Sequence, residues 1–173
     1  DHRIIGQAGV LDSTRFMAFL GMETGVSIKN ITGMTLGSHG DDMVPLSRFS
    51  LVGGRPTQEV VEKDKLDAII SRTKKGGGEI VKLMGTSAYW APAAGTILMA
   101  ESILLDKKMI LPCHARLNGE YGIEGLFVGV PVQLGKNGIE KIVEFDLTDE
   151  EKAALKKSAD HVQEVCDIVD KME

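Results

Sequence analysis

The chain has 173 residues, of which 43% are hydrophobic and 26% charged, and its net charge is -5. This size and composition are typical of one globular domain with a sizeable core. Acidic and basic residues are interspersed and no apolar run approaches 18 residues, which argues against nucleic-acid and membrane partners. The two cysteines, Cys113 and Cys166, lie far apart without CxxC spacing. We therefore expect free thiols in a reducing cytoplasm rather than a disulfide framework or a zinc site.

The spacing of apolar residues predicts the secondary structure in chain order. The elements expected in the first part are a helix at 7–25, a strand at 31–36, a short strand at 49–52, a helix at 57–75, a short helix at 78–83 and an apolar helix at 91–108. Thr57 is the expected N-cap of the helix that it begins, and the three glycines at 76–78 should interrupt that helix. Pro92 falls in the first turn of the apolar helix, where a missing N–H costs little.

After residue 108 the period changes to that of strands. The elements expected here are strands at 109–117, 126–134 and 139–145 and a helix from 149 to about 172. The Asn137-Gly138 pair predicts a hairpin between the last two strands, and Pro131 should occupy an edge or a bulge. Thr148 and Glu151 form a capping box. The last helix should have one apolar face, formed by Leu155, Ala159, Val162, Cys166 and Val169. This order predicts an α+β fold with mostly antiparallel sheets and packed helices.

Asp12 and Arg15 are three residues apart on the first predicted helix, so they share a face. Taken alone, they would form only a surface ion pair, worth under about 1 kcal/mol. The flanking Val10, Leu11 and Phe16 instead predict a helix that is largely buried. A buried carboxylate and a buried guanidinium must each find a partner.

His39 lies in the loop at 37–42, directly after a predicted strand. A glycine-containing loop lets the backbone approach a ligand, and histidine exchanges a proton near neutral pH. One alternative is an ordinary loop histidine without a function. Another is a metal cluster with Asp41 and Asp42, but this needs further ligands at defined spacing, and the nearby sequence supplies none. We therefore expect no metal.

Together, these side chains match the needs of a 2-keto acid. Its carboxylate requires a planar, bidentate donor, which Arg15 supplies. Its carbonyl oxygen requires a proton donor, for which His39 is suited. A histidine cation in turn requires a carboxylate that orients the ring and balances its charge, and Asp12 is the candidate.

Two segments resemble the signature segments of the catalytic domain in the lactate/malate dehydrogenase family: GQAGVLDSTR at 6–15 and LGSHGD at 36–41. GTSAYWAPA at 85–93 and FVGVPV at 127–132 extend the resemblance over essentially the whole chain, in the family's order. The resemblance implies the fold of the family's C-terminal domain.

The resemblance also implies roles for individual residues. His39 would be the proton donor and acceptor, Asp12 its hydrogen-bonded partner, and Arg15 the clamp for the substrate carboxylate. Ser87 and Ala88 would lie near the nicotinamide of the cofactor and the substrate. An alternative reading of Ser87 and Ala88 is that they only begin a buried helix.

By the same resemblance, residues 1–173 would be the catalytic and substrate-binding domain, and the NAD-binding domain would be absent from this chain. Accordingly, no Gly-x-Gly-x-x-Gly follows a predicted strand, and the glycines at 135 and 138 belong to a hairpin turn. The first residues lead directly into the similar segment, so we expect the chain to start at a domain boundary. We expect NAD to be the cofactor, held mainly by the missing half, and the isolated chain to have negligible turnover.

The segments at 40–45 and 87–92 resemble the malate dehydrogenases that are built like lactate dehydrogenases. This favours a small dicarboxylate substrate, malate or oxaloacetate, and a cytoplasmic place in the tricarboxylic acid cycle. Lactate is the alternative substrate. In the family, a residue of the other domain contacts the far end of the substrate and distinguishes malate from lactate, and this chain does not contain that residue.

A second class of function is an oligomerisation module in which the three side chains are unused. The family forms dimers and tetramers, so a homo-oligomer is expected in either case. The apolar helix around Ile97, Leu98, Ile103 and Leu104 would then be a subunit contact instead of core. A more distant alternative is a metal-assisted hydrolase that uses His39 with Asp41 and Asp42.

Overall fold

The computed structural model describes residues 2–172. Its helices are α1 (Ala8–Thr24), α2 (Thr57–Val60), α3 (Lys63–Met84), α4 (Trp90–Leu104) and α5 (Asp149–Asp170), with 3-10 turns η1 (Ile28–Asn30), η2 (Ser47–Phe49) and η3 (Glu120–Gly122). Its strands are β1 (Ile31–Thr32), β2 (Thr35–Leu36), β3 (Val44–Pro45), β4 (Leu51–Val52), β5 (Arg55–Pro56), β6 (Met109–Asn118), β7 (Glu124–Gly135) and β8 (Gly138–Ile142). All strand pairs are antiparallel, so the predicted α+β class with antiparallel sheets is confirmed.

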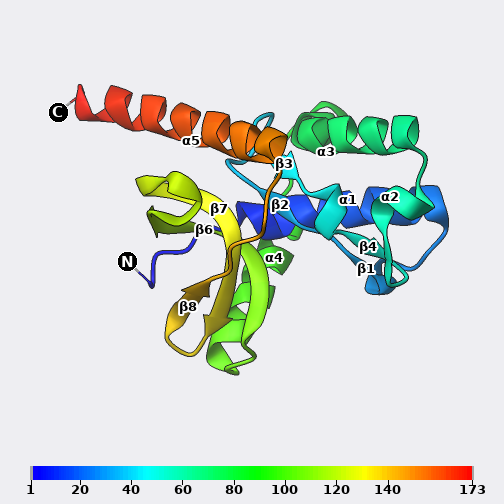
Figure 1. Cartoon of the computed structure of the whole chain (residues 1–173), viewed down its shortest axis with the longest axis horizontal. Helices are drawn as coiled ribbons and strands as arrows, with labels where there is room; N and C mark the ends of the chain where they lie inside the picture. The colour runs from blue at the N-terminus through cyan, green and yellow to red at the C-terminus, as the bar shows by residue number, and fades with distance from the viewer. Residues whose placement is uncertain (1, 173) are drawn as a thin grey trace.

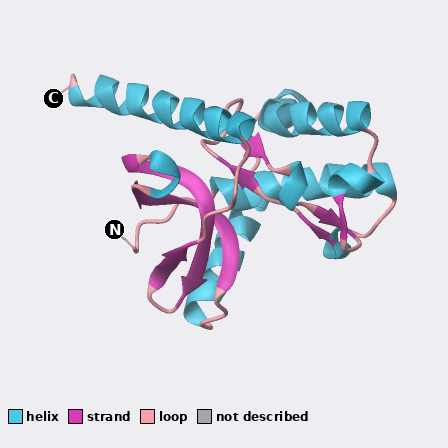
Figure 2. Ribbon diagram, viewed as in Figure 1, coloured by secondary structure: helices cyan, strands magenta, loops and turns pink. Residues whose placement is uncertain are grey.

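The largest sheet has the strand order β6-β7-β8 and curves around one end of the molecule (Figure 2). Helix α4 runs beside it, α5 passes over it, and α1 lies at the centre of the molecule below α3 (Figure 1). One cluster of buried apolar side chains joins the sheet to α4 and the first half of α5. A second cluster fills the space between α1, α3 and the short strands. Helix α1 contributes to both clusters and is therefore held on both sides.

Helix α1 agrees with the predicted helix at 7–25. Phe16 and Leu20 are fully buried, and Gly25 ends the helix in the left-handed conformation (φ 69°) while its N–H donates to the Gly21 carbonyl. Glycine is favoured there because it adopts positive φ without a Cβ clash. A central helix packed on both sides provides a rigid support for the side chains at 12 and 15.

The single strand predicted at 31–36 is wrong, because the chain forms two short strands in different sheets. β1 pairs with β4, whereas β2 pairs with β3. The break falls at Gly33, which packs against α1 so closely that a Cβ would lie 2.7 Å from the Met17 Cγ. The neighbouring Met34 carbonyl accepts a hydrogen bond from the Leu46 N–H, which extends the pairing of β2 with β3 and not that of β1 with β4. The strand predicted at 49–52 is shorter too, since β4 begins at Leu51.

The helix predicted at 57–75 is also divided differently. Thr57 lies inside α2, whose N-cap is Pro56, and its buried hydroxyl donates to the Ser50 carbonyl. The extended, buried Val61 separates α2 from α3. The glycines at 76–78 do not interrupt α3, which continues to Met84. Glycine weakens a helix by about 1 kcal/mol but does not prevent its hydrogen bonds, so tertiary packing decides the outcome.

The apolar helix α4 ends at Leu104, four residues earlier than predicted, because Asp106 and Lys108 after it adopt positive φ. Pro92 lies in its first turn, as predicted. The side chains of Leu98 and Ile103 pack against the core, whereas Ile97 and Leu104 are exposed. Helix α4 is therefore partly core and partly an uncovered apolar surface.

The hairpin of β7 and β8 is confirmed, with Gly138 at φ 92°. The prediction for Pro131 is wrong, since it lies in the central strand, opposite Pro112 of β6. Strand β8 ends at Ile142, opposite Val132, so no residue of β8 lies opposite Pro131 to accept a backbone hydrogen bond. The Val143 N–H still donates to the Pro131 carbonyl, and the Val143 carbonyl accepts from the Tyr121 hydroxyl. The missing N–H of the proline is thus compensated by a tyrosine side chain.

Helix α5 begins with the predicted capping box of Thr148 and Glu151. Its predicted apolar face is buried only in the first half, at Leu155 and Ala159. The second half extends past the rest of the molecule (Figure 1) and exposes apolar side chains that include Val169. Among the described residues, no helix has both the length and the apolar character needed to cross a bilayer.

Candidate active site

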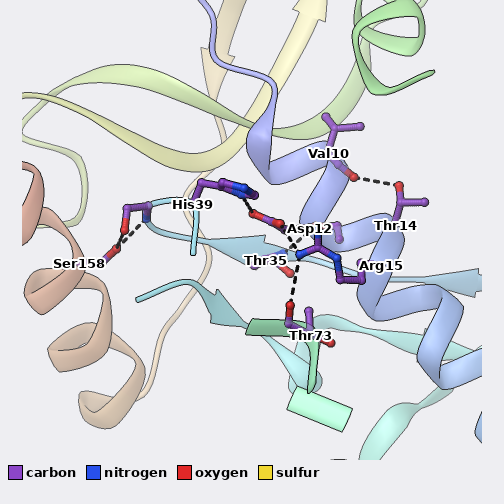
Figure 3. A network of polar contacts seen from close by, with 10 residues as sticks. Val10, Asp12, Thr14, Arg15, Thr35, His39, Thr73 and Ser158 are labelled. Atoms are coloured by element: carbon purple, nitrogen blue, oxygen red, sulfur yellow. Dashed lines mark hydrogen bonds and ion pairs between the residues drawn. The ribbon is translucent and has the colours of Figure 1, made fainter. Parts of the chain in front are cut away.

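Asp12 is the buried centre of the site. Helix α1 carries it with a side-chain exposure of 2%, and its two carboxylate oxygens contact different partners. Oδ1 accepts from the Arg15 Nη1 at 3.1 Å, and Oδ2 contacts the His39 Nδ1 at 2.8 Å. Figure 3 shows the carboxylate between the guanidinium and the imidazole. The alternative of a plain surface ion pair is therefore wrong for Asp12 and Arg15.

His39 lies in the loop between β2 and β3, with its side chain 49% exposed. The Asp12 hydrogen bond raises the pKa of His39 above its usual 6.5, although burial and the Arg15 charge act in the opposite direction. An ionised carboxylate only accepts hydrogen bonds, so Nδ1 is the donor and Nε2 is left for a reacting group. A histidine held in this way can donate a proton and take it back.

Arg15 is held from two helices. Its Nη1 donates to Asp12 on α1 and to the Thr73 carbonyl on α3, at 3.2 Å (Figure 3). The side chain is only 12% exposed. These contacts orient the guanidinium and leave its remaining donors for the carboxylate of a ligand.

Gly76 of α3 provides the space that Arg15 occupies, and this leads to a stability prediction. A Cβ on Gly76 would lie 2.4 Å from the Arg15 Cδ and 2.8 Å from its Nε. Gly76→Ala should therefore lower the free energy of unfolding by about 1–3 kcal/mol, despite the better helix propensity of alanine. The matched control is Gly77→Ala, because a Cβ there meets nothing within 4 Å. That control should stabilise the chain by roughly 0.5–1 kcal/mol in urea denaturation, and equal effects of the two variants would contradict the packing argument.

A cavity of about 680 Å³ connects these side chains. Arg15 and His39 line it together with Ser87, which lies on the segment between α3 and α4. The structure therefore brings Arg15, His39 and Ser87 to one cavity, with Asp12 buried behind the first two. The volume falls within the usual range for small-ligand sites.

The residues of the metal alternative are arranged differently. Asp42 forms an ion pair with Lys157 of α5 at 3.1 Å, and Asp41 lines the cavity. Within residues 2–172, no three His, Cys, Asp or Glu side chains are grouped so that they could hold a metal ion. Nothing in this arrangement favours a metal-assisted hydrolase.

Four further residues near the site were not predicted from the sequence. Lys74 and Lys75 line the cavity, which follows from the uninterrupted path of α3 past the glycines. Gln7 also lines it, and its buried Oε1 accepts no hydrogen bond from any described residue. His114 on β6 lies close enough to interact electrostatically with Asp12, and burial lowers the pKa of its imidazole. A prediction in which the helix continues through residues 76–78 would have placed Lys74 and Lys75 near the site. No local signal in the sequence marks Gln7 or His114.

The fold of this chain recurs in solved malate and lactate dehydrogenases. The malate dehydrogenase from Salinibacter ruber superposes with a TM-score of 0.97 at 48% identity, over 99% of this chain and 56% of that chain. The lactate dehydrogenase from Eimeria maxima with NADH and oxamate has a TM-score of 0.95 at 41% identity, over 99% of this chain and 55% of that one. The fold and the site therefore define a dehydrogenase-type C-terminal domain.

Residues 9–172 match the family described as lactate/malate dehydrogenase, alpha/beta C-terminal domain. The chain belongs to the lactate/malate dehydrogenase family. It is 56% identical over 165 residues to the malate dehydrogenase of Bacillus israeli, covering 95% of this chain and 53% of that protein. It is 58% identical over 167 residues to that of Sorangium cellulosum, covering 96% and 53%. The chain thus spans about half the length of the curated relatives that it matches.

Proposed function

We propose that residues 1–173 form the catalytic and substrate-binding domain of an NAD-dependent malate dehydrogenase, an oxidoreductase that interconverts malate and oxaloacetate. The observation that carries this proposal is the Asp12 carboxylate, which bridges Arg15 and His39 at the wall of a cavity suited to a small acid. The names of the relatives at 54–58% identity support malate as the substrate. Lactate is the second candidate, because lactate dehydrogenases share the fold.

Each side chain has a distinct role in the proposed reaction. Arg15 binds the carboxylate of oxaloacetate next to the keto group, because a guanidinium matches a carboxylate with two hydrogen bonds. His39 donates its Nε2 proton to the keto oxygen as the carbon is reduced, which yields the hydroxyl of malate. Asp12 stabilises the protonated imidazole and keeps Nδ1 as the donor towards itself. In the reverse direction, neutral His39 takes the proton from the hydroxyl.

The residues of the cavity fit the nicotinamide end of NAD. NADH, when bound, supplies the hydride. Ser87 offers a hydroxyl at the cavity, and the small Ala8, Ala88 and Gly77 leave room there for a flat ring. These 173 residues contain no glycine-rich phosphate loop after a strand, so the rest of the dinucleotide would be bound by the part of the relatives' length that this chain does not span. We propose Ser87 as the cofactor-contacting residue of this domain.

We also propose that the cytoplasmic enzyme is a homo-oligomer, a dimer or a tetramer. This proposal is supported by exposed apolar side chains near the cavity and on α4, among them Leu83, Trp90, Ile97 and Leu104. Trp90 is 77% and Leu104 is 81% exposed, which is costly for large apolar side chains in water. The nucleotide-binding half or a second subunit would cover them.

Reconstitution tests the proposal. The chain alone should reduce oxaloacetate with NADH at a negligible rate, whereas fusion to the amino-terminal half of a related malate dehydrogenase should restore turnover. NADH absorbance measures the rate, pyruvate replaces oxaloacetate to test lactate activity, and His39→Asn provides the background. Sedimentation of the same sample measures assembly. A fusion that folds, binds NADH and reduces neither keto acid would contradict the proposal, as would an isolated chain with ordinary enzyme rates.

A further inference from the structure

Ser158 of α5 connects the last helix to the loop that carries His39. Its side chain is fully buried. Its Oγ accepts a hydrogen bond from the Ser38 N–H at 2.6 Å and donates to the Ser38 Oγ at 3.0 Å. In Figure 3 these bonds join Ser158 to the chain directly beside His39. The two serines are 120 residues apart in the sequence.

The His39 loop needs such attachments because its own backbone is permissive. Gly37 and Gly40 on either side of His39 have φ of 83° and 112°, values that glycine adopts freely. At its start, the loop is joined to β7 by two backbone hydrogen bonds between Gly37 and Gly129. Gly37 also packs against α5 so closely that a Cβ would lie 2.6 Å from the Ser158 Oγ. Beyond Gly37, Asp42 pairs with Lys157, whose side chain is 79% exposed, so this ion pair contributes little.

We propose that Ser158 is a positioning residue, whose hydroxyl fixes the Ser38 backbone and thereby holds the His39 imidazole against the Asp12 carboxylate. This inference rests on the proposed function, in which His39 transfers the proton. Ser158 touches neither Asp12 nor the cavity, so it acts only through the loop. The ring itself is half exposed, and among residues 2–172 its side-chain hydrogen bond is the one to Asp12. A displacement of the Ser38 peptide would therefore weaken the hydrogen bond between His39 and Asp12.

The test measures His39 in the 173-residue chain without cofactor or substrate. The C2 proton of each histidine is titrated by NMR, and His39→Asn identifies the resonance of interest. The charged and titratable groups around His39 are Asp12 and Arg15 on α1, His114 on β6, Asp41 in its own loop, and Lys74 and Lys75 across the cavity. Ser158→Ala leaves all of these in place. The pKa of His39 should nevertheless fall towards 6.5, because the Asp12 hydrogen bond that raises it is populated less.

Ser102→Ala is the matched control. Ser102 is also a fully buried serine, and its hydroxyl donates to the Leu134 carbonyl and accepts from the Met109 N–H, away from the His39 loop. Both variants should lower the melting temperature, but only Ser158→Ala should change the His39 titration. An unchanged titration in Ser158→Ala, or an equal change in Ser102→Ala, would overturn the positioning role.

A second measurement needs no variant and covers the case in which Ser158→Ala fails to fold. The Ser38 amide should be protected from hydrogen exchange in the unmodified chain, and exchange as fast as in an exposed loop would also overturn the inference. In the reconstituted enzyme, Ser158→Ala should lower kcat by about tenfold with little change in KM, since only the general acid is misplaced. The titration and the hydrogen exchange do not depend on turnover, so they test the positioning role of Ser158 even if the enzyme proposal fails.

Discussion

Replacing Asp12 with asparagine should lower kcat/KM for oxaloacetate in the reconstituted enzyme by on the order of 10³-fold. Asparagine preserves the shape of the side chain but removes the charge that stabilises protonated His39 and orients its ring. The same change leaves Arg15, which is 12% exposed, without its carboxylate partner. Because an uncompensated buried charge is costly, we also expect a loss of stability on the order of 3 kcal/mol.

The His39 titration should respond in a defined direction. Asp12 raises the pKa of His39 through its hydrogen bond and its charge, whereas burial and Arg15 lower it. With Asp12 neutralised, only the lowering influences remain, so the pKa of His39 should fall below 6.5. In the unmodified chain, the protonated pair stabilises the fold fully below pH 6.5, and this stabilisation is lost as the pH rises through the raised pKa of folded His39. The stability difference between the two chains should therefore shrink at alkaline pH.

Glu23→Gln is the matched control for Asp12→Asn. It neutralises another carboxylate of α1, which pairs with Lys65 far from the cavity. NMR titration, urea denaturation at two pH values and NADH-dependent rates are measured for both variants. If Asp12→Asn leaves the pKa of His39 above 6.5, another group must hold the imidazole and the assigned role of Asp12 is wrong.

Arg15→Lys should raise KM for oxaloacetate on the order of 100-fold. Lysine keeps the charge but loses the planar fork, so it cannot bind a carboxylate through two parallel hydrogen bonds. A single ammonium also cannot reproduce the arrangement in which Arg15 contacts Asp12 and the Thr73 carbonyl while donors remain for a ligand. Arg15→Ala should weaken binding further because the charge is lost as well.

Arg72→Lys is the control for this prediction. Arg72 lies on α3 outside the cavity, where it pairs with Glu79 and stacks over the Phe19 ring. Initial rates over a range of oxaloacetate concentrations should give an unchanged KM for this control. A normal KM in Arg15→Lys, with the fold intact, would show that another cation binds the substrate carboxylate, and Lys74 would be the first candidate to replace.

The sequence predicted the residues of the site better than it predicted their surroundings. Asp12, Arg15 and His39 were identified from residue chemistry, helical spacing and resemblance, and the structure brings them together. Their catalytic roles remain predictions. Ser158 was not identified, because a serine in a surface-like helical pattern has no local feature that distinguishes it. Its role depends on a contact between residues 38 and 158 that only folding creates.

The sequence alone determined the features that depend only on residues close together along the chain. The helix at α1 with its glycine end, the capping box of Thr148 and Glu151, and the hairpin at Gly138 all follow from short-range backbone geometry and periodicity. The α+β class follows from the order of these elements.

Tertiary packing decided the features in which a local preference competes with a distant contact. Helix α3 continues through three glycines where Gly76 accommodates Arg15, and the strand at 31–36 breaks at Gly33 against α1. The second half of α5 continues the apolar face in sequence, but this half extends past the core and leaves that face exposed. Local propensities amount to about 1 kcal/mol per residue, which is less than the cost of a steric clash in a packed interior. The final geometry around Asp12 is therefore set by the packing of α1, α3 and the His39 loop.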